Sequence, residues 1–151
     1  METHPDATRH LAANPLFEIG NHSYIHPHMR GLSGERVDSE LEKTQDIMYK
    51  LTNKQGNLFR PPYGEYDDAL LARASRLGLR TITWEVVSGD PDPNVKAGPM
   101  VREVVRRVRP GSIVIMHVNG RGWHTAEALP GIIAGLERRG YRFVTVDEAL
   151  R

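Results

Sequence analysis

Residues 58–64 read Leu-Phe-Arg-Pro-Pro-Tyr-Gly, a short apolar run that ends in a stiff polar turn. The two prolines fix their own φ angles, and Gly64 permits a backbone conformation that other residues resist. A segment of helical period follows, with one apolar face formed by Leu70, Leu71, Ala74 and Leu77. This order of apolar run, polar turn and amphipathic helix predicts one unit of alternating strand and helix.

The same alternation extends along the chain. Short apolar runs occur at residues 16–19, 58–59, 81–84, 113–116 and 142–146. Further helical faces are marked by Val37, Leu41, Met48 and Leu51, by Val101, Val104, Val105 and Val108, and by Leu129, Ile132, Ile133 and Leu136. Alternation of this kind favours parallel strands joined by right-handed crossovers, so the sequence predicts an α/β fold. In such folds, open sheets or barrels, the site lies at the carboxyl ends of the strands.

Length and composition narrow the class of protein. The 151 residues predict a single domain over residues 1–151. Lys and Arg total 20 and Asp and Glu total 19, a balance that gives no electrostatic footprint for nucleic acid. The absence of cysteine excludes disulfides and thiolate metal ligands. No pattern of a membrane span or signal peptide is present, and the compartment is not predicted.

Two histidines four residues apart follow the first apolar run, in His22-Ser23-Tyr24-Ile25-His26-Pro27. Neutral imidazoles are good ligands for zinc and its neighbours, and two of them supply part of a set of three or four. Pro27 disfavours helical dihedrals at His26, which predicts an ordered loop. A loop histidine is more often a polar surface group, so both interpretations stay open for the pair alone.

Polar residues also follow the other predicted strands. Arg60 could face a carboxylate while the turn after it presents a backbone N–H to an oxyanion, or the segment could merely end a strand. His117 ends the run 113–116, where barrel enzymes place catalytic groups, although a core histidine is the alternative. Asp90 could support such a histidine as imidazolium or could be an ordinary turn residue.

Two tryptophans are candidate sugar platforms, because an indole offers a broad apolar face. Trp84 ends a predicted strand, where tryptophan is more often part of the core. Trp123 lies between Gly122 and His124, so we expect it to be the more exposed of the two.

Together and in this order, His-Ser-x-x-His-Pro, Arg-Pro-Pro-Tyr-Gly, a Trp-x-x-x-x-x-Asp segment and a strand-ending histidine resemble the polysaccharide deacetylase family, carbohydrate esterase family 4. The likeness extends from Glu18 to the C-terminus. It implies an α/β fold of the distorted (β/α) barrel type, with fewer strands than the eight of a triosephosphate isomerase barrel. It also implies hydrolysis of N- or O-acetyl groups on a carbohydrate polymer such as chitin, peptidoglycan or xylan.

The resemblance implies a role for each matching residue. His22 and His26 would bind a divalent metal, with zinc as the expected ion, and the Tyr63 backbone N–H would stabilise the oxyanion. His117 would act as general acid, with Asp90 supporting its charged form. The remaining implied roles are orientation of the catalytic aspartate by Arg60 and contact with an acetylated polysaccharide by Tyr63, Pro61, Trp84 and Trp123.

The sequence departs from the family pattern in two places. The family begins with a strand that ends in a Thr-Phe-Asp-Asp-like motif, which supplies the base and a metal ligand, and residues 1–21 contain none. Val87 and Pro91 also stand where the family often has an acid and a tryptophan. We therefore expect a barrel that lacks its first strands, with weak or absent activity and an exposed sheet edge that invites self-association.

Two alternative functions stay open beside the deacetylase. One is a non-catalytic glycan-binding remnant that retains the groove without the reaction. The other is a hydrolase of cyclic amides in purine breakdown, a substrate class found among relatives of this fold. Members of the family are often exported or periplasmic.

Overall fold

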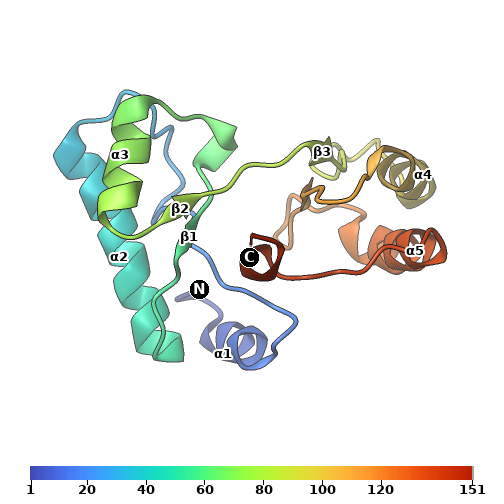
Figure 1. The fold of residues 1–151 in the computed structure, drawn as a ribbon, viewed down its shortest axis with the longest axis horizontal. Coiled ribbons are helices and arrows are strands. Elements are labelled where there is room, and N and C mark those ends of the chain that lie inside the picture. Colours follow the sequence, from blue (N-terminus) through green and yellow to red (C-terminus); the bar gives the residue numbers. More distant parts are fainter. Residues whose placement is uncertain (151) are drawn as a thin grey trace. The chain divides into compact units, whose positions relative to one another are not determined.

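The computed structural model describes residues 1–150, which form two compact units (Figure 1). The first unit contains residues 1–83 together with the C-terminal segment that starts at Thr145, and the second contains Trp84–Val144. One domain over residues 1–151 stays a prediction. Within residues 1–150, no helix is both long enough and apolar enough to cross a membrane.

Three parallel segments lie side by side in the first unit. β1 (Leu58–Phe59) pairs in parallel with β2 (Arg80–Thr81), and Asn21 forms a parallel bridge to Phe59. The helices of this unit are α1 (Pro5–Ala13), α2 (Gly34–Thr52), α3 (Asp68–Arg76) and the short α6 (Val146–Ala149), with a 3-10 turn η1 (Pro62–Gly64). The helices α2 and α3 connect the successive parallel segments, which confirms the alternation expected from the sequence.

Amphipathic faces of α2 and α3 build the core of the first unit. Ser33 is the N-cap of α2, because its side-chain oxygen accepts a hydrogen bond from the Arg36 N–H. Asp67 does the same for α3 by accepting from the Leu70 N–H. The buried cluster consists of Met29, Val37, Leu41, Phe59, Leu70, Ala74 and Leu79. Its helical members recur at the spacing of one helix face, as the sequence predicts.

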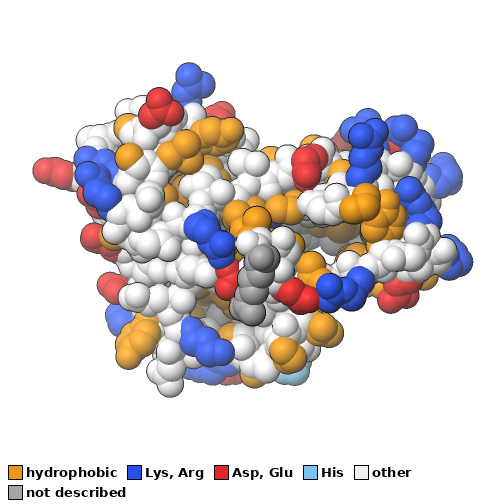
Figure 2. Space-filling view, viewed as in Figure 1, with side chains coloured by type: hydrophobic (Ala, Val, Ile, Leu, Met, Phe, Trp, Pro, Cys, Tyr) orange, Lys and Arg blue, Asp and Glu red, His pale blue; other side chains and the backbone are white. Residues whose placement is uncertain are grey.

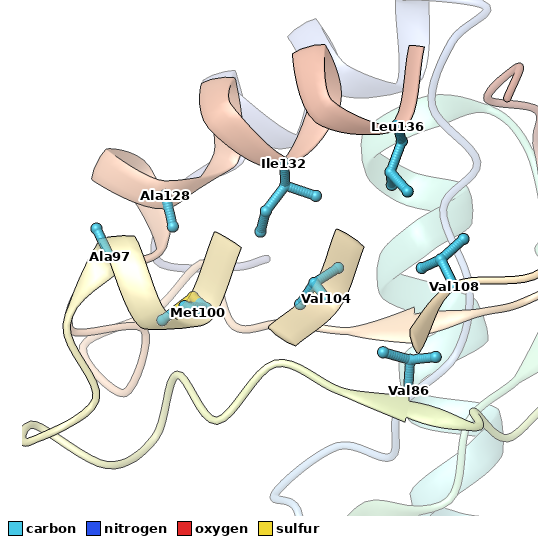
Figure 3. Close-up of a cluster of buried hydrophobic side chains, with 8 residues drawn as sticks. All are labelled: Val86, Ala97, Met100, Val104, Val108, Ala128, Ile132 and Leu136. Atoms are coloured by element: carbon cyan, nitrogen blue, oxygen red, sulfur yellow. The ribbon is translucent and has the colours of Figure 1, made fainter. Parts of the chain in front are cut away.

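The second unit is smaller and also alternates strands with helices. β3 (Val86–Val87) pairs in parallel with β4 (Val114–Ile115), and α4 (Ala97–Arg107) connects them. α5 (Thr125–Arg138) lies against α4, and Figure 3 shows their side chains facing one another. The buried hydrophobic cluster of the second unit comprises Val86, Ala97, Met100, Val104, Val108, Ala128, Ile132 and Leu136.

The arginines of α4 lie on its solvent face. Arg102, Arg106 and Arg107 are exposed, whereas Val104 is buried. Figure 2 shows Lys and Arg side chains gathered over the region of α4. Arg106 and Arg107 both pair with Glu103 on the same helix. The arginines therefore form the hydrated face of an amphipathic helix.

Three predicted strands need correction. Residues 16–19 are not a strand in the described chain, and Leu16 and Phe17 are exposed, because a strand needs a ladder partner and the first pairing starts only at Asn21. The run 81–84 is divided, because its start belongs to β2 and the next pairing begins at β3. Residues 142–146 lead instead into α6, since the Thr145 hydroxyl accepts from the Glu148 N–H and caps that helix.

Candidate functional site

Asn21 fixes the start of the histidine loop in the first unit. Its N–H donates to the Leu58 carbonyl, and its own carbonyl accepts from the Arg60 N–H. Its buried side-chain amide donates to the carbonyl of Leu41 and to Gln45 on α2. Asn21 thus joins the loop both to β1 and to α2, and His22 follows at the carboxyl end of this parallel segment.

The loop from residue 21 to residue 26 contains two residues in the left-handed region. Ser23 has φ 62° and His26 has φ 58°, a conformation that residues other than glycine rarely adopt. The side chains of Asn21 and Ser23 stabilise this backbone conformation. The Ser23 N–H donates to Asn21 Oδ1 at 3.0 Å, and the His26 N–H donates to Ser23 Oγ at 3.0 Å. The serine of the His-Ser-x-x-His motif therefore fixes the second histidine.

The two histidine rings are neighbours. Their centroids lie 4.8 Å apart at an interplanar angle of 76°. His22 Nδ1 lies 2.6 Å from the Arg60 carbonyl oxygen. A carbonyl can only accept, so this contact assigns the ring proton to Nδ1 and the lone pair to Nε2, as is usual for histidines that bind metals.

The histidine pair would supply two ligands of a metal site. His22 and His26 offer two adjacent imidazoles of the kind that zinc and neighbouring ions prefer. Among residues 1–150, no group of three His, Cys, Asp or Glu side chains is arranged to hold a metal ion. The pair fits two positions of a catalytic metal site, which commonly has three protein ligands.

Tyr63 lies beside His26, in the 3-10 turn η1 that follows β1. Its ring meets His26 edge-on at 4.7 Å and stacks on His28 at 4.0 Å. Its backbone is in the left-handed region, with φ 59°, and its side chain is exposed. The Pro61 ring is fully buried, so we assign that ring to packing rather than to a substrate surface. Arg60 is half-buried, and burial lowers the pKa of its guanidinium.

The second unit contains a buried acid bonded to a histidine. Asp90 is 1% exposed, and its Oδ1 lies 2.9 Å from His117 Nδ1. The same carboxylate accepts hydrogen bonds from the His117 N–H, from Ser88 Oγ at 3.0 Å and from Thr125 Oγ1 at 2.7 Å. Burial raises the pKa of Asp90, but these hydrogen bonds, led by that of the His117 ring, outweigh it and hold the pKa below its ordinary value. The carboxylate therefore stays charged beside the ring.

A close turn shapes the segment after His117. A Cβ atom added to Gly122 would lie 2.1 Å from the His117 carbonyl oxygen, so only glycine fits there without a shift. The next residue, Trp123, is 61% exposed and donates its N–H to the Asp90 carbonyl. Trp84 is half-buried. The difference in exposure between the two tryptophans agrees with the sequence-based expectation.

Comparison with known proteins identifies the family. The family model for polysaccharide deacetylase matches residues 1–82, which include the histidine loop and the turn after β1. The chain belongs to the polysaccharide deacetylase family. The roles of the histidine pair and of the Arg-Pro-Pro-Tyr-Gly turn stay predictions from the resemblance.

Individual relatives support the same assignment. The peptidoglycan-N-acetylmuramic acid deacetylase PdaA of Bacillus subtilis is 33% identical over 135 residues, which are 87% of this chain and 51% of that protein. A family 4 carbohydrate esterase pseudoenzyme from Bacillus anthracis superposes with a TM-score of 0.90 at 30% identity, covering 99% of this chain and 52% of that one. The family 4 acetyl xylan esterase from Clostridium thermocellum, solved with a cobalt ion, gives 0.90 at 28% identity over 99% and 71% of the two chains.

These superpositions confirm the fold class. The polysaccharide deacetylase chain adopts part of the distorted (β/α) barrel of carbohydrate esterase family 4. It spans about half the length of PdaA, the curated relative described above.

The structure groups the predicted residues within each unit and adds others. His22, His26 and Tyr63 lie together in the first unit, and Asp90 and His117 lie together in the second. Sequence reasoning missed a set of supporting side chains, namely Asn21, Glu40, Ser88 and Thr125. The sequence position of two of them gives a weak indication of their role, because Asn21 directly precedes a candidate metal ligand and Thr125 is the first residue of a helix.

Proposed function

We propose that the protein to which this chain belongs is a metal-dependent hydrolase that removes N- or O-acetyl groups from a carbohydrate polymer of the peptidoglycan, chitin or xylan type. The observation that carries the proposal is the adjacent pair of His22 and His26, oriented by the Arg60 carbonyl. Family membership supports the reaction class. Relatives named for peptidoglycan and for acetyl xylan support the substrate range.

His22 and His26 would hold a divalent metal ion, and zinc is the expected one. When bound, such an ion polarises a carbonyl and lowers the pKa of a bound water. The cobalt ion in the acetyl xylan esterase relative supports a divalent metal in this family. The Tyr63 backbone N–H, placed in a rigid turn, would donate to the oxyanion that develops on the acetyl carbonyl.

His117 would act as general acid. Asp90 is bonded to Nδ1 of that ring, so the other ring nitrogen, Nε2, would donate a proton to the departing amine or alcohol. Asp90 would orient the ring and stabilise its charged form, the part that a buried carboxylate plays beside other catalytic histidines. Arg60 would orient the catalytic aspartate, and the exposed Trp123, with Trp84, would contact the sugar.

Metal retention tests the histidine pair directly. We expect the purified wild type to retain zinc or cobalt after dialysis and His22→Ala to lose it. His28→Ala is the matched control, because His28 is exposed in the same segment and pairs with Glu65. Equal metal content in the wild type and in His22→Ala would remove His22 from the ligand set.

Acetate release tests the reaction. We expect this 151-residue chain to release acetate from acetylated xylan or a chitin oligomer slowly or not at all, because residues 1–21 carry no Thr-Phe-Asp-Asp-like motif. Loss of a general base alone typically lowers a rate by factors of about 10² to 10⁴. Turnover at roughly 1 to 10³ s⁻¹ with zinc would contradict that expectation.

A second candidate function is non-catalytic glycan binding. The observation that favours it is the incomplete ligand set, since residues 1–150 contain no group of three side chains arranged for a metal. A relative described as a pseudoenzyme provides a precedent. Binding of an acetylated oligosaccharide that requires Trp123, with no acetate released when metal is supplied, would favour this candidate over the hydrolase.

A further inference from the structure

A buried carboxylate from α2 lies under the histidine loop. Glu40 is 1% exposed, and its Oε2 accepts hydrogen bonds from the N–H groups of Tyr24 and Ile25, each at 2.9 Å. Its Oε1 lies 2.9 Å from Nη2 of Arg36, one helical turn earlier. Burial of a charge is costly unless a counter-charge and donors surround it, and these three contacts meet that requirement.

Three side chains accept four consecutive N–H groups of this loop. Asn21 accepts from residue 23, Glu40 accepts from residues 24 and 25, and Ser23 accepts from residue 26. These hydrogen bonds replace the ladder of a helix or sheet. Side chains rather than regular secondary structure therefore determine the conformation of the loop.

Other contacts in the middle of the loop are made at the surface: the Tyr24 hydroxyl donates to Glu2 at 3.5 Å, and Lys43 Nζ lies 5.7 Å from the centroid of the Tyr24 ring. The side chain of Tyr24 is 44% exposed and that of Ile25 is 59% exposed, so burial of these side chains does not hold the segment. Both residues lie between His22 and His26 in the chain. A change in their backbone would change the separation and angle of the two rings.

We propose that Glu40 is a positioning residue for metal binding, which fixes the backbone between the two histidines and thereby sets their ring geometry. The inference rests on the proposed function, because it assigns Glu40 a role toward a divalent ion held by His22 and His26. Glu40 acts through the N–H groups of Tyr24 and Ile25. This is the kind of outer-shell support that tunes metal ligands in proteins.

The test compares Glu40→Gln with Glu42→Gln in the complete 151-residue chain. The first variant retains the shape of the side chain and removes its charge, which weakens hydrogen bonds that a charged acceptor makes. The second removes the same charge from an exposed position on the same helix. In metal-free protein, we expect amide hydrogen exchange at Tyr24 and Ile25 to rise roughly tenfold in Glu40→Gln. We expect no change in Glu42→Gln.

A Co²⁺ titration followed by visible absorption provides the second measurement. We expect the dissociation constant for Co²⁺ to rise about 10- to 100-fold in Glu40→Gln, the usual effect of losing outer-shell support. It should stay within about twofold in Glu42→Gln. If Glu40→Gln does not fold, Glu40→Asp takes its place, because it retains the charge and loses the reach to the two N–H groups.

The outcomes separate this inference from the proposed function. Unchanged exchange at Tyr24 and Ile25, or unchanged Co²⁺ affinity while His22→Ala abolishes binding, would overturn the role of Glu40 and leave the metal site in place. No Co²⁺ uptake by the wild type would overturn the metal site, and with it the role of Glu40 toward a metal.

Discussion

The two units hold their candidate site residues in different ways. In the first unit, the ring of His22 contacts the Arg60 carbonyl, and Asn21, Ser23 and Glu40 hold the loop backbone that leads to His26. In the second unit, the ring of His117 is itself bonded to Asp90. The placement of His26 therefore depends on residues that bond to the loop backbone, whereas the placement of His117 depends on the carboxylate bonded to its ring.

This difference predicts different consequences of substitution. Changes around Asp90 remove hydrogen bonds from a buried charge and should lower stability strongly. Changes in the histidine loop should cost less stability, because part of the loop is exposed, and should act mainly on ring placement. The experiments below separate the two effects.

Asp90→Asn should have the largest effect. Asp90 accepts four hydrogen bonds, and an amide would turn an NH₂ group toward donors. Breaking a buried pair costs roughly 3 to 5 kcal/mol, and we expect a loss of that size in the free energy of unfolding of the second unit. Urea unfolding with amide exchange at Val104 measures it. The control is Asp92→Asn, at an exposed position nearby, and equal losses in both variants would contradict the prediction.

Low pH should reduce the contribution of the Asp90 carboxylate to the free energy of unfolding. The pKa of Asp90 is lowered in the folded state, so its contribution is fully present above the unfolded pKa, about 3.9, and is lost as the pH falls through the lower folded value. The difference in unfolding free energy between the wild type and Asp90→Asn should therefore shrink as the pH falls below about 4. A difference that stays constant down to about pH 2 would show that the charge of Asp90 does not contribute.

Gly122→Ala should have an intermediate effect. The added Cβ would meet the His117 carbonyl oxygen at 2.1 Å, whereas the same atom at Gly120 would meet nothing within 4 Å. Overpacking of this kind costs about 1 to 3 kcal/mol, and Gly120→Ala should stay within about 0.5 kcal/mol of the wild type. Thermal unfolding measures stability, and the imidazole NMR signals of His117 report on the ring. Equal behaviour of the two variants would contradict the close approach.

Ser23→Ala should have the smallest effect on stability. It removes the acceptor of the His26 N–H, which is worth about 1 kcal/mol. Amide exchange at His26 should rise and Co²⁺ affinity should fall, whereas Ser75→Ala, at an exposed position on α3, should change neither. A loss of stability as large as that of Asp90→Asn would remove the distinction between the two units.

The helices could be predicted because their signal is local and repeated. Val37, Leu41 and Met48 recur at helical spacing and are all buried on α2. The run 16–19 has the composition of a strand, yet a strand is defined by its partner, and composition does not specify one. Thr145 shows a related limit, since its capping bond leads the chain into α6 where an apolar run predicts a strand.

Candidate ligands and catalytic groups were also predictable, because His22, His26, Asp90 and His117 carry distinctive chemistry in a fixed order. Their supporting residues were not. Glu40 lies on a helix with several other acidic residues, and its partners are 15 and 16 positions earlier in the chain. No local pattern distinguishes it from an exposed glutamate such as Glu42.

The sequence by itself determined the alternation of strand and helix, the family and the chemical identity of the candidate site residues, because each of these depends on residue type and local spacing. The tertiary structure decided which segments pair as strands, which glutamate is buried and that Thr125 bonds to Asp90. These depend on contacts between residues distant in the chain, where burial and the need to satisfy every buried polar group select one partner among many.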